Sequence, residues 1–400
     1  MTCGPGAVTP VLLELAAPLP PEAGERWPRY RERVEERLGS VLAKAAELLA
    51  LSLHPLIAAN ACHGAATGEQ IQEIDQGVLG RGVRRVAWNP EVRAQIATVA
   101  RRLGVDPLRS AAGGLTGCGV RVAVLDSGID PRHPFLKVAS AVSTCPEPAG
   151  VPGRHGTFCA GVIASRHPHY AGIAPEVELL DVKIARSDGV TTPAALAQGI
   201  DEAMDRHADV LSISFGLNQE GHGWTCPNGD CILCRAADHA ARCGAVVVTA
   251  AGNQHRSKVS SRGTPRTELL CPGQARRAIT VGATEKAPTA ELYPLSSHGP
   301  TAYGLPKPDL VAPGVDVIST ILGDGTNEDH LFSLGSGTSV SAAVVAGAVA
   351  LLIEARKRRG EAWTPEEIRS ELLGRCVRRL EGELPNAAGA GCLDLSGMCR

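Results

Sequence analysis

The fold is decided by residues 335–347, which read GSGTSVSAAVVAG. Glycines allow a sharp turn before a hydroxyl residue, and the small apolar residues that follow predict a tightly packed, buried helix. Ser339 would then lie at the N-terminus of this helix, where unpaired N–H groups and the helix dipole favour negative charge. Such a serine either caps a core helix or attacks a carbonyl group whose oxyanion is then held by those N–H groups.

Upstream of this stretch, buried strand patterns alternate with helical patterns from residue 120 onwards. We predict strands at 120–125, 179–184, 210–214, 245–250 and 279–281. We predict helices at 156–165, 192–207, 231–243, 338–357 and 365–373. This alternation is typical of a parallel sheet with helices on both faces, and such sheets carry their functional groups at the carboxyl ends of the strands.

The first hundred residues have a different organisation. Strand patterns at 8–16, 53–61 and 83–89 alternate with helical patterns at 27–53 and 68–74, the second of which is capped by Thr67. We therefore predict a small α+β domain at 1–96, a glycine-containing linker at 97–116 and a large α/β domain at 117–400.

Composition excludes several classes of protein. The 400 residues are 44% hydrophobic, enough for a large core, and the formal net charge is -2 with no long basic run, so nucleic acid is not an expected partner. The first residues lack a secretory pattern, and we expect no membrane span. We expect a cytoplasmic protein, with non-classical export as the alternative, and mostly reduced thiols among its thirteen cysteines.

Three further residues are of the types that carry chemistry. Asp126 ends the first strand of the α/β region, His155 begins a helix of small residues, and Asn253 follows Gly252 at the end of another strand. A buried carboxylate needs a partner, histidine transfers protons near neutral pH, and an amide can donate to an oxyanion. Singly, each has a structural alternative: a strand-end aspartate, a helix-start histidine or a turn asparagine.

Taken together with Ser339, these residues provide what a serine acyl-transfer site requires. In this order and on this scaffold, the region 115–400 resembles the subtilisin-like serine proteases. The resemblance implies a three-layer α/β/α fold with a mostly parallel sheet. It also implies that Asp126 orients the imidazole, His155 is the general base, Asn253 is the oxyanion-hole amide and Ser339 is the nucleophile.

The same resemblance indicates where substrate binds. Ser214, Phe215 and Gly216 match the edge segment that pairs with a substrate strand, and Ala250, Ala251 and Gly252 match the facing wall of the pocket. Backbone pairing does not discriminate between side chains, so specificity must lie in the pockets. We expect Leu270 to narrow the pocket for the residue before the scissile bond and to disfavour bulky aromatic residues.

The sequence departs from the family pattern in two places. The nucleophile's helix lacks the proline that relatives carry, which we expect to soften the geometry without removing the nucleophile. The loop 165–170, SRHPHY, lacks carboxylate and amide ligands, so we expect the family's strong calcium site to be absent and no cofactor to be required. His133, His167 and His169 lie in proline-containing loops, where we expect them to be solvated.

The N-terminal α+β domain resembles, by pattern, the family's inhibitory, ferredoxin-like propeptide. In that interpretation it is an intramolecular inhibitor that self-cleavage between residues 89 and 114 would release. The alternative is a permanent accessory domain.

Three cysteines, Cys226, Cys231 and Cys234, lie within nine residues. They could supply zinc thiolates, with His222, His239 or Cys243 as a fourth ligand. The alternative, which the sequence favours, is a local disulfide or free thiols. We expect Cys159 to pack behind His155 as a small hydrophobic residue. Cys392 and Cys399 could form a disulfide if the chain reaches an oxidising compartment.

The sequence thus predicts a serine endopeptidase that is made as a zymogen and acts on peptides or proteins. Two alternatives remain open: a catalytically silent relative that binds peptides in the same groove, and a dedicated maturation protease for one partner peptide.

Overall fold

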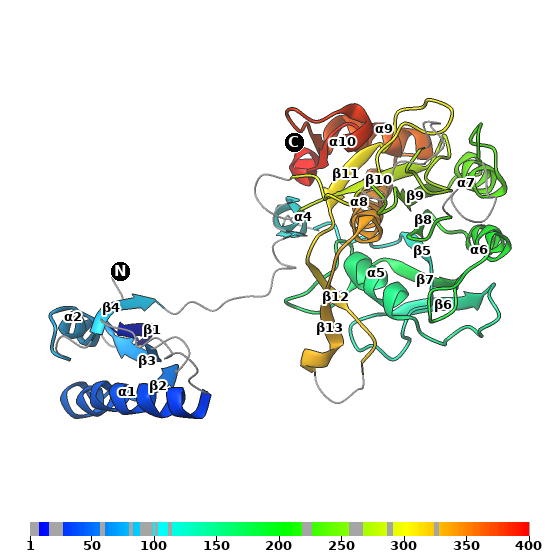
Figure 1. Cartoon of the computed structure of the whole chain (residues 1–400). Coiled ribbons are helices and arrows are strands. Elements are labelled where there is room, and N and C mark those ends of the chain that lie inside the picture. Colours follow the sequence, from blue (N-terminus) through cyan, green and yellow to red (C-terminus); the bar gives the residue numbers. More distant parts are fainter. Residues whose placement is uncertain are drawn as a thin grey trace, which may run out of the picture. The chain divides into compact units, whose positions relative to one another are not determined.

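The computed structural model describes residues 8–15, 27–56, 61–79, 83–88, 99–100, 103–110, 114–217, 226–255, 267–285, 291–323 and 328–399. The chain divides into two compact units, Met1–Arg93 and Ala94–Arg400, which we describe separately (Figure 1).

The first unit has the element order β1 α1 β2 β3 α2 β4. Its bounds are β1 Val8–Leu15, α1 Trp27–Leu49, β2 Leu53–Leu56, β3 Ala61–Thr67, α2 Gly68–Asp75 and β4 Val83–Trp88. The sheet is antiparallel in the order β2-β3-β1-β4, and a small core lies between it and the helices. Both the element order and the strand order are those of a ferredoxin-like fold.

Sequence reasoning was correct about the cap of α2 and wrong about the second strand of this unit. The Thr67 hydroxyl accepts from the Gln70 N–H while the Gln70 side chain accepts from the Thr67 N–H, which makes a capping box. The single strand predicted at 53–61 is instead the short β2, which pairs with a further strand, β3. The sequence of β3, ACHGAAT, has Thr67 as its one β-branched residue and no Phe, Tyr or Trp, so it gives little strand signal.

The second unit is built on a nine-stranded sheet in the order β14-β15-β11-β10-β9-β8-β5-β7-β6. Its strands are β5 Arg121–Asp126, β6 Val138–Ser143, β7 Glu178–Lys183, β8 Val210–Ile213, β9 Val246–Ala250, β10 Ile279–Thr284, β11 Leu310–Pro313, β14 Val377–Arg378 and β15 Cys392–Leu393. Every pairing within it is parallel except that of β14 with β15. The predicted mostly parallel sheet is therefore confirmed.

Helices cover both faces of this sheet (Figure 1). They are α4 Val105–Ser110, α5 Arg154–Ala164, α6 Pro193–Asp205, α7 Ile232–Arg242, α8 Thr338–Arg358, α9 Pro365–Arg375 and α10 Pro385–Ala388. Alternate residues of β5 enter two different cores: Val122 and Val124 pack in the core with α5 and α8, whereas Ala123 and Leu125 pack in the core with α6 and α7. The predicted three-layer α/β/α architecture is confirmed.

Four smaller elements also belong to the described part of this unit. A hairpin of β12 Val317–Thr320 and β13 Phe332–Gly335 contains the 3-10 turn η2 Glu328–Leu331, and η3 Leu395–Cys399 lies near the end of the chain. β13 leads through Ser336 and Gly337 directly into α8, so the hairpin carries the chain to the start of the central helix.

Helix α8 is the core helix that residues 335–347 predict. It is long and apolar enough to cross a membrane, but 89% of its apolar window is buried inside the protein. Its burial against the sheet and α5 accounts for its composition.

Part of the region that we predict as a linker packs into the second unit. Val99, Ala100, Leu103, Val105 and Leu108 are buried in the core that contains α5 and α8. The Leu395 N–H also donates to the Leu103 carbonyl at 2.7 Å. These described residues of 99–110 are therefore structural members of the larger unit.

The expectation of solvated histidines was wrong for two of the three. His133 and His167 are buried, whereas His169 is exposed. The His167 ring lies edge-on to Phe135 at 4.5 Å between centroids and to Phe332 at 5.0 Å. A cluster of rings from two loops and the start of β13 buries these histidines, and local sequence does not reveal such long-range packing.

Candidate active site

Asp126 lies at the carboxyl end of β5 and is fully buried. Its Oδ1 accepts from the Ser127 N–H at 2.7 Å, and the Ser127 hydroxyl accepts from the Gly156 N–H at 3.1 Å. The buried ammonium of Lys183 donates to the Ser127 carbonyl at 2.5 Å. The backbone that follows Asp126 is therefore fixed by contacts with two other elements, α5 and β7.

His155 occupies the first turn of α5, where its ring meets Asp126. The Nδ1 atom lies 2.8 Å from Oδ2 and 2.9 Å from Oδ1 of Asp126, and the imidazole side chain is 43% exposed. Phe215 lies edge-on to the ring with 5.5 Å between centroids. The imidazole thus has one nitrogen bound by a buried carboxylate and an open side toward solvent.

The electrostatics at His155 favour the protonated ring. Desolvation by burial lowers the pKa, but the charge of Asp126, its hydrogen bond and the nearby Cys159 sulfur outweigh this effect. The pKa of His155 is therefore raised well above its usual value. Cys159 is fully buried, with Sγ 3.9 Å from His155 Nδ1 and 3.6 Å from the Ser214 hydroxyl, as expected of a residue packed behind the ring.

Ser339 is the second residue of α8 and is half-buried. Gly337, before the helix, has a φ of 145°, which favours glycine. A Cβ atom on Gly337 would lie 3.1 Å from Asn253 Nδ2 and 3.5 Å from Ser339 Oγ. The Asn253 amide and the Ser339 hydroxyl therefore both lie beside Gly337. Because this glycine has no side chain, the space between the two groups stays open.

The orientation of the Asn253 side chain is set by the residue before Ser339. Asn253 Oδ1 accepts from the Thr338 N–H at 3.0 Å, and the Thr338 hydroxyl accepts from the Gly252 N–H at 3.1 Å. Because the carbonyl oxygen of the amide is used in this way, Nδ2 is left as a donor toward the space beside Ser339. Thr338 has a positioning role that the sequence did not suggest.

The predicted substrate segments end neighbouring strands. Ser214–Gly216 follow β8, and Ala250–Gly252 begin at the last residue of β9. Both strands run parallel to β5, so these segments and Asp126 lie at one edge of the sheet. The Ser214 hydroxyl donates to the Ser339 carbonyl at 3.2 Å. This hydrogen bond connects the edge segment to the start of α8.

Leu270 lies between the two substrate segments. A Cβ atom on Gly216 would lie 2.7 Å from Leu270 Cβ, and one on Gly252 would lie 2.8 Å from Leu270 Cγ. The Leu270 N–H also donates to the Ala251 carbonyl at 3.0 Å. The side chain therefore occupies the space into which a pocket between these segments would extend.

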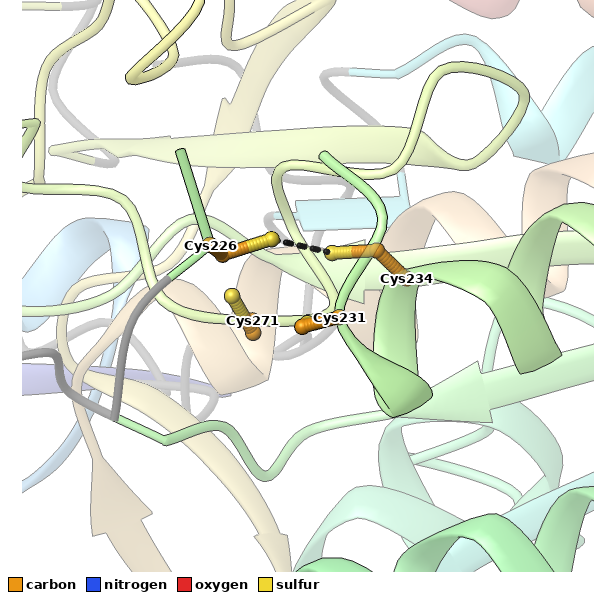
Figure 2. A group of neighbouring side chains, drawn as sticks. All are labelled: Cys226, Cys231, Cys234 and Cys271. Carbon is orange, nitrogen blue, oxygen red and sulfur yellow. Dashed lines mark hydrogen bonds between the residues drawn. The ribbon is translucent and has the colours of Figure 1, made fainter. Parts of the chain in front are cut away.

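The cysteine cluster includes a member that sequence reasoning missed. Cys226, Cys231 and Cys234 gather with Cys271, and all four sulfur atoms lie within 4.8 Å of one another (Figure 2). Of the fourth ligands suggested from sequence, His239 and Cys243 are exposed, and His222 lies outside the described residues. A lone cysteine before a proline, far along the chain, gives no motif by which it could have been found.

Two other expectations concern the periphery of this unit. Cys392 is buried, with Sγ 3.9 Å from the Thr284 hydroxyl, and the side chain of Cys399 lies outside the described residues, so their pairing stays a prediction. In the loop after α5, His167 Nδ1 accepts from the N–H groups of His169 and Tyr170 at 3.1 and 2.9 Å. The absence of a strong calcium site there also stays a prediction.

The fold and the residues at this edge of the sheet define the class of protein. A carboxylate-bound imidazole, a serine at a helix N-terminus and an oriented amide are the groups of a serine protease. The chain belongs to the subtilase family, whose model matches residues 117–391, and it is a subtilisin-like serine endopeptidase.

Named relatives support this assignment. The serine protease AprX of Bacillus subtilis (strain 168) is 33% identical over 343 residues, which cover 78% of this chain and 73% of AprX. Subtilisin BL of Lederbergia lenta is 34% identical over 263 residues, which cover 65% of this chain and 84% of that relative. A solved structure of a mutant of the protease domain of PatA aligns with a TM-score of 0.56 at 27% identity, covering 72% of this chain and 96% of that one.

Proposed function

We propose that the protein hydrolyses peptide bonds with Ser339 as nucleophile, His155 as general base and Asp126 as the residue that orients and stabilises the imidazole. The observation that carries this proposal is the contact of His155 Nδ1 with the Asp126 carboxylate, at 2.8 Å to Oδ2. Because the carboxylate accepts at Nδ1, the neutral ring carries its proton there, and Nε2 is the atom that accepts the Ser339 proton.

The reaction then follows from the chemistry of these groups. Ser339 Oγ attacks the scissile carbonyl as its proton passes to His155, and the imidazolium is stabilised by Asp126. Asn253 Nδ2 and the Ser339 N–H donate to the oxyanion. His155 gives the proton to the leaving amine as the C–N bond breaks. Water then attacks the acyl group while His155 takes its proton, and the bond to Ser339 Oγ breaks as that oxygen regains the proton from His155.

Substrate would bind as an extended strand along Ser214–Gly216. Main-chain pairing at this edge gives affinity for any peptide, and the pocket beside Leu270 selects the residue before the scissile bond. Incubation of the purified chain with a peptide library, followed by mass spectrometry of the new termini, tests this function directly. Products that appear in equal amounts with the Ser339→Ala variant would contradict it.

We further propose that the N-terminal unit is an intramolecular inhibitor removed by self-cleavage between residues 89 and 98. Residues from Val99 onwards include core members of the larger unit, so a cut before them would leave that core intact. The ferredoxin-like order of the first unit supports the comparison with a propeptide. N-terminal sequencing of the mature chain checks the position of the cut, and a mature N-terminus within α4 or beyond would contradict it.

Replacement of Asn253 by Ala should lower kcat by about 10² to 10³, the usual cost of losing one oxyanion donor. KM should change much less, because the amide acts mainly in the transition state. Steady-state kinetics on a peptide ester or anilide measure both constants. Gln254→Ala, at the next position, is the matched control, and a similar loss there would show that the Asn253 effect is not specific.

The pH profile should reflect the raised pKa of His155. Since the neutral ring is the base, kcat/KM should rise with pH and level off only well above the usual pKa of histidine. Asp181, whose pKa burial raises to about 7, also titrates near neutral pH, so the profile is measured for Asp181→Asn as well. An unchanged rising limb in that variant assigns the limb to His155, and loss of the limb would assign it to Asp181.

Leu270 should determine the size of the residue accepted before the scissile bond. We expect the wild type to cleave after Leu or Ala faster than after Phe, and Leu270→Ala to raise kcat/KM for Phe relative to Leu by about tenfold. Competition between matched peptide substrates measures this ratio. A wild type that prefers Phe, or a variant with an unchanged ratio, would refute this role of Leu270.

A further inference from the structure

Four cysteine side chains from two distant segments meet beside the substrate edge. Cys226 and Cys231 bracket a turn, Cys234 lies in the first turn of α7, and Cys271 comes from the segment after Leu270. The side chains of Cys226, Cys234 and Cys271 are fully buried and that of Cys231 is half-buried. Figure 2 shows the four gathered in one place, with the sulfur atoms of Cys226 and Cys234 facing each other.

The spacing of the sulfur atoms matches a metal site better than a disulfide. The Cys226 and Cys234 sulfurs are 3.6 Å apart, and all four lie within 4.8 Å of one another. A tetrahedral zinc ion with Zn–S bonds of about 2.3 Å holds its sulfurs about 3.8 Å apart. A disulfide requires a separation of about 2.05 Å and joins only two of the four.

The protein holds these residues in place by contacts that do not involve sulfur. Gly229, in the turn between Cys226 and Cys231, has a φ of 69°, and a Cβ atom there would lie 2.4 Å from the Tyr303 ring. Arg276 donates to the Asn228 carbonyl at 3.0 Å and stacks over Tyr303 at 4.3 Å. The turn is thus fixed against the rest of the unit by its contacts with Tyr303 and Arg276.

The surroundings of the cluster would stabilise thiolates that are bound to a cation. Cys231 is the N-cap residue of the eleven-residue α7, and Cys234 lies in its first turn, where the helix dipole stabilises negative charge. The Gln274 side-chain amide also donates toward Cys271 Sγ at 3.5 Å. Buried thiolates of this number need a cation, because like charges in an apolar core repel one another.

We propose that Cys226, Cys231, Cys234 and Cys271 bind one structural zinc ion in a closed, four-thiolate site. Binding replaces the S–H protons, which pass to solvent, by four Zn–S bonds, and no sulfur changes its oxidation state. All four coordination positions are filled by protein, so the ion supplies structure and takes no part in peptide hydrolysis.

The zinc ion also fixes one wall of the substrate groove. Leu217 and Cys271 exchange backbone hydrogen bonds of 2.9 and 3.1 Å, and each directly follows a residue of the groove, Gly216 and Leu270 respectively. Zinc on Cys271 therefore holds this pair of segments to the start of α7. This link to the groove rests on the proposed function, whereas the metal site itself does not.

Metal content of the full chain carrying Ser339→Ala tests the site without self-digestion. We expect about one zinc per chain by elemental mass spectrometry, released when a mercurial reagent displaces the ion from the four thiolates. Cobalt exchanged into the same protein should give the sulfur-to-metal absorption of a tetrahedral thiolate site. Iron in place of zinc, no metal, or disulfides among these four cysteines by peptide mapping would overturn the proposal.

Single variants locate the ion. Cys271→Ser and Cys234→Ser should lose the zinc, whereas Cys243→Ser, an exposed cysteine at the end of the same helix, should keep it. The cobalt spectrum of the parent protein decides the question if a variant fails to fold. Zinc retained by a folded Cys271→Ser would contradict the site.

Removal of zinc by a chelator from the processed wild type tests the link to the groove. We expect KM for peptides to rise, with kcat less affected, and both to recover when zinc is added. An unchanged KM would overturn the link while leaving the metal site intact. If zinc is bound but no peptide is hydrolysed under any condition, it is the proposed function that fails.

Discussion

Replacement of Ser339 by Ala should lower kcat by about 10⁶-fold and leave the chain uncleaved at its full 41.5 kDa. The variant retains the oxyanion donors and the groove but has no oxygen to attack the carbonyl. Its fold should be unchanged, because Ser339 is half-buried and the contact to Ser214 uses the Ser339 backbone carbonyl. Single-turnover kinetics and gel electrophoresis of the expressed protein measure the two effects.

Ser341→Ala is the matched control on the same helix. The Ser341 hydroxyl is buried and donates to the Ala312 carbonyl at 2.8 Å, so its loss should cost about 1 kcal/mol of stability and leave kcat within a few-fold of the wild type. If Ser341→Ala were inactive while folded, or Ser339→Ala kept more than about one hundredth of the activity, the nucleophile would be wrongly assigned.

Replacement of Asp126 by Asn should lower kcat by about 10⁴-fold near neutral pH. An amide of the same shape cannot stabilise the imidazolium, and it can donate to Nδ1 and so favour the wrong tautomer of His155. The same change should bring the pKa of His155 down, because the charge of Asp126 is the main effect that raises it. Kinetics across the pH range, with nuclear magnetic resonance of the ring, follow both results.

Asp130→Asn tests whether the Asp126 effect depends on position. Asp130 belongs to the same LDSGID motif and is buried, but its carboxylate accepts from the Arg132 N–H at 3.0 Å and serves the loop. We expect near wild-type kcat in this variant. A loss of about 10⁴-fold there as well would indicate that both changes act by disturbing the loop.

The α/β core could be predicted because its elements carry strong, local patterns. The helix predicted at 338–357 is found as Thr338–Arg358, and the strand predicted at 120–125 is found as Arg121–Asp126. Shorter elements were missed where the pattern is weak. β11, Leu310–Pro313, has four residues and ends in proline, and it is a strand because β10 and β15 pair with it on either side.

The residues of the candidate site could be named from the sequence, and the catalytic roles given to Asp126, His155, Asn253 and Ser339 stay predictions. Asp126 and His155 follow from a strand end and a helix start that the parallel sheet brings together. Sequence does not indicate which atom of an amide faces the backbone, so the orientation of Asn253 by Thr338 required the structure. Cys271 was missed for a related reason: its partners are its neighbours only in three dimensions.

The most direct test of the catalytic assignment is covalent labelling of the active serine. The wild type, freed of its N-terminal unit, is treated with a peptidyl phosphonate, and the modified residue is located by tandem mass spectrometry. We predict one phosphonate per chain on Ser339 and none on the Ser339→Ala variant. No adduct on an intact, folded wild type, or an adduct on another serine such as Ser341, would contradict the account.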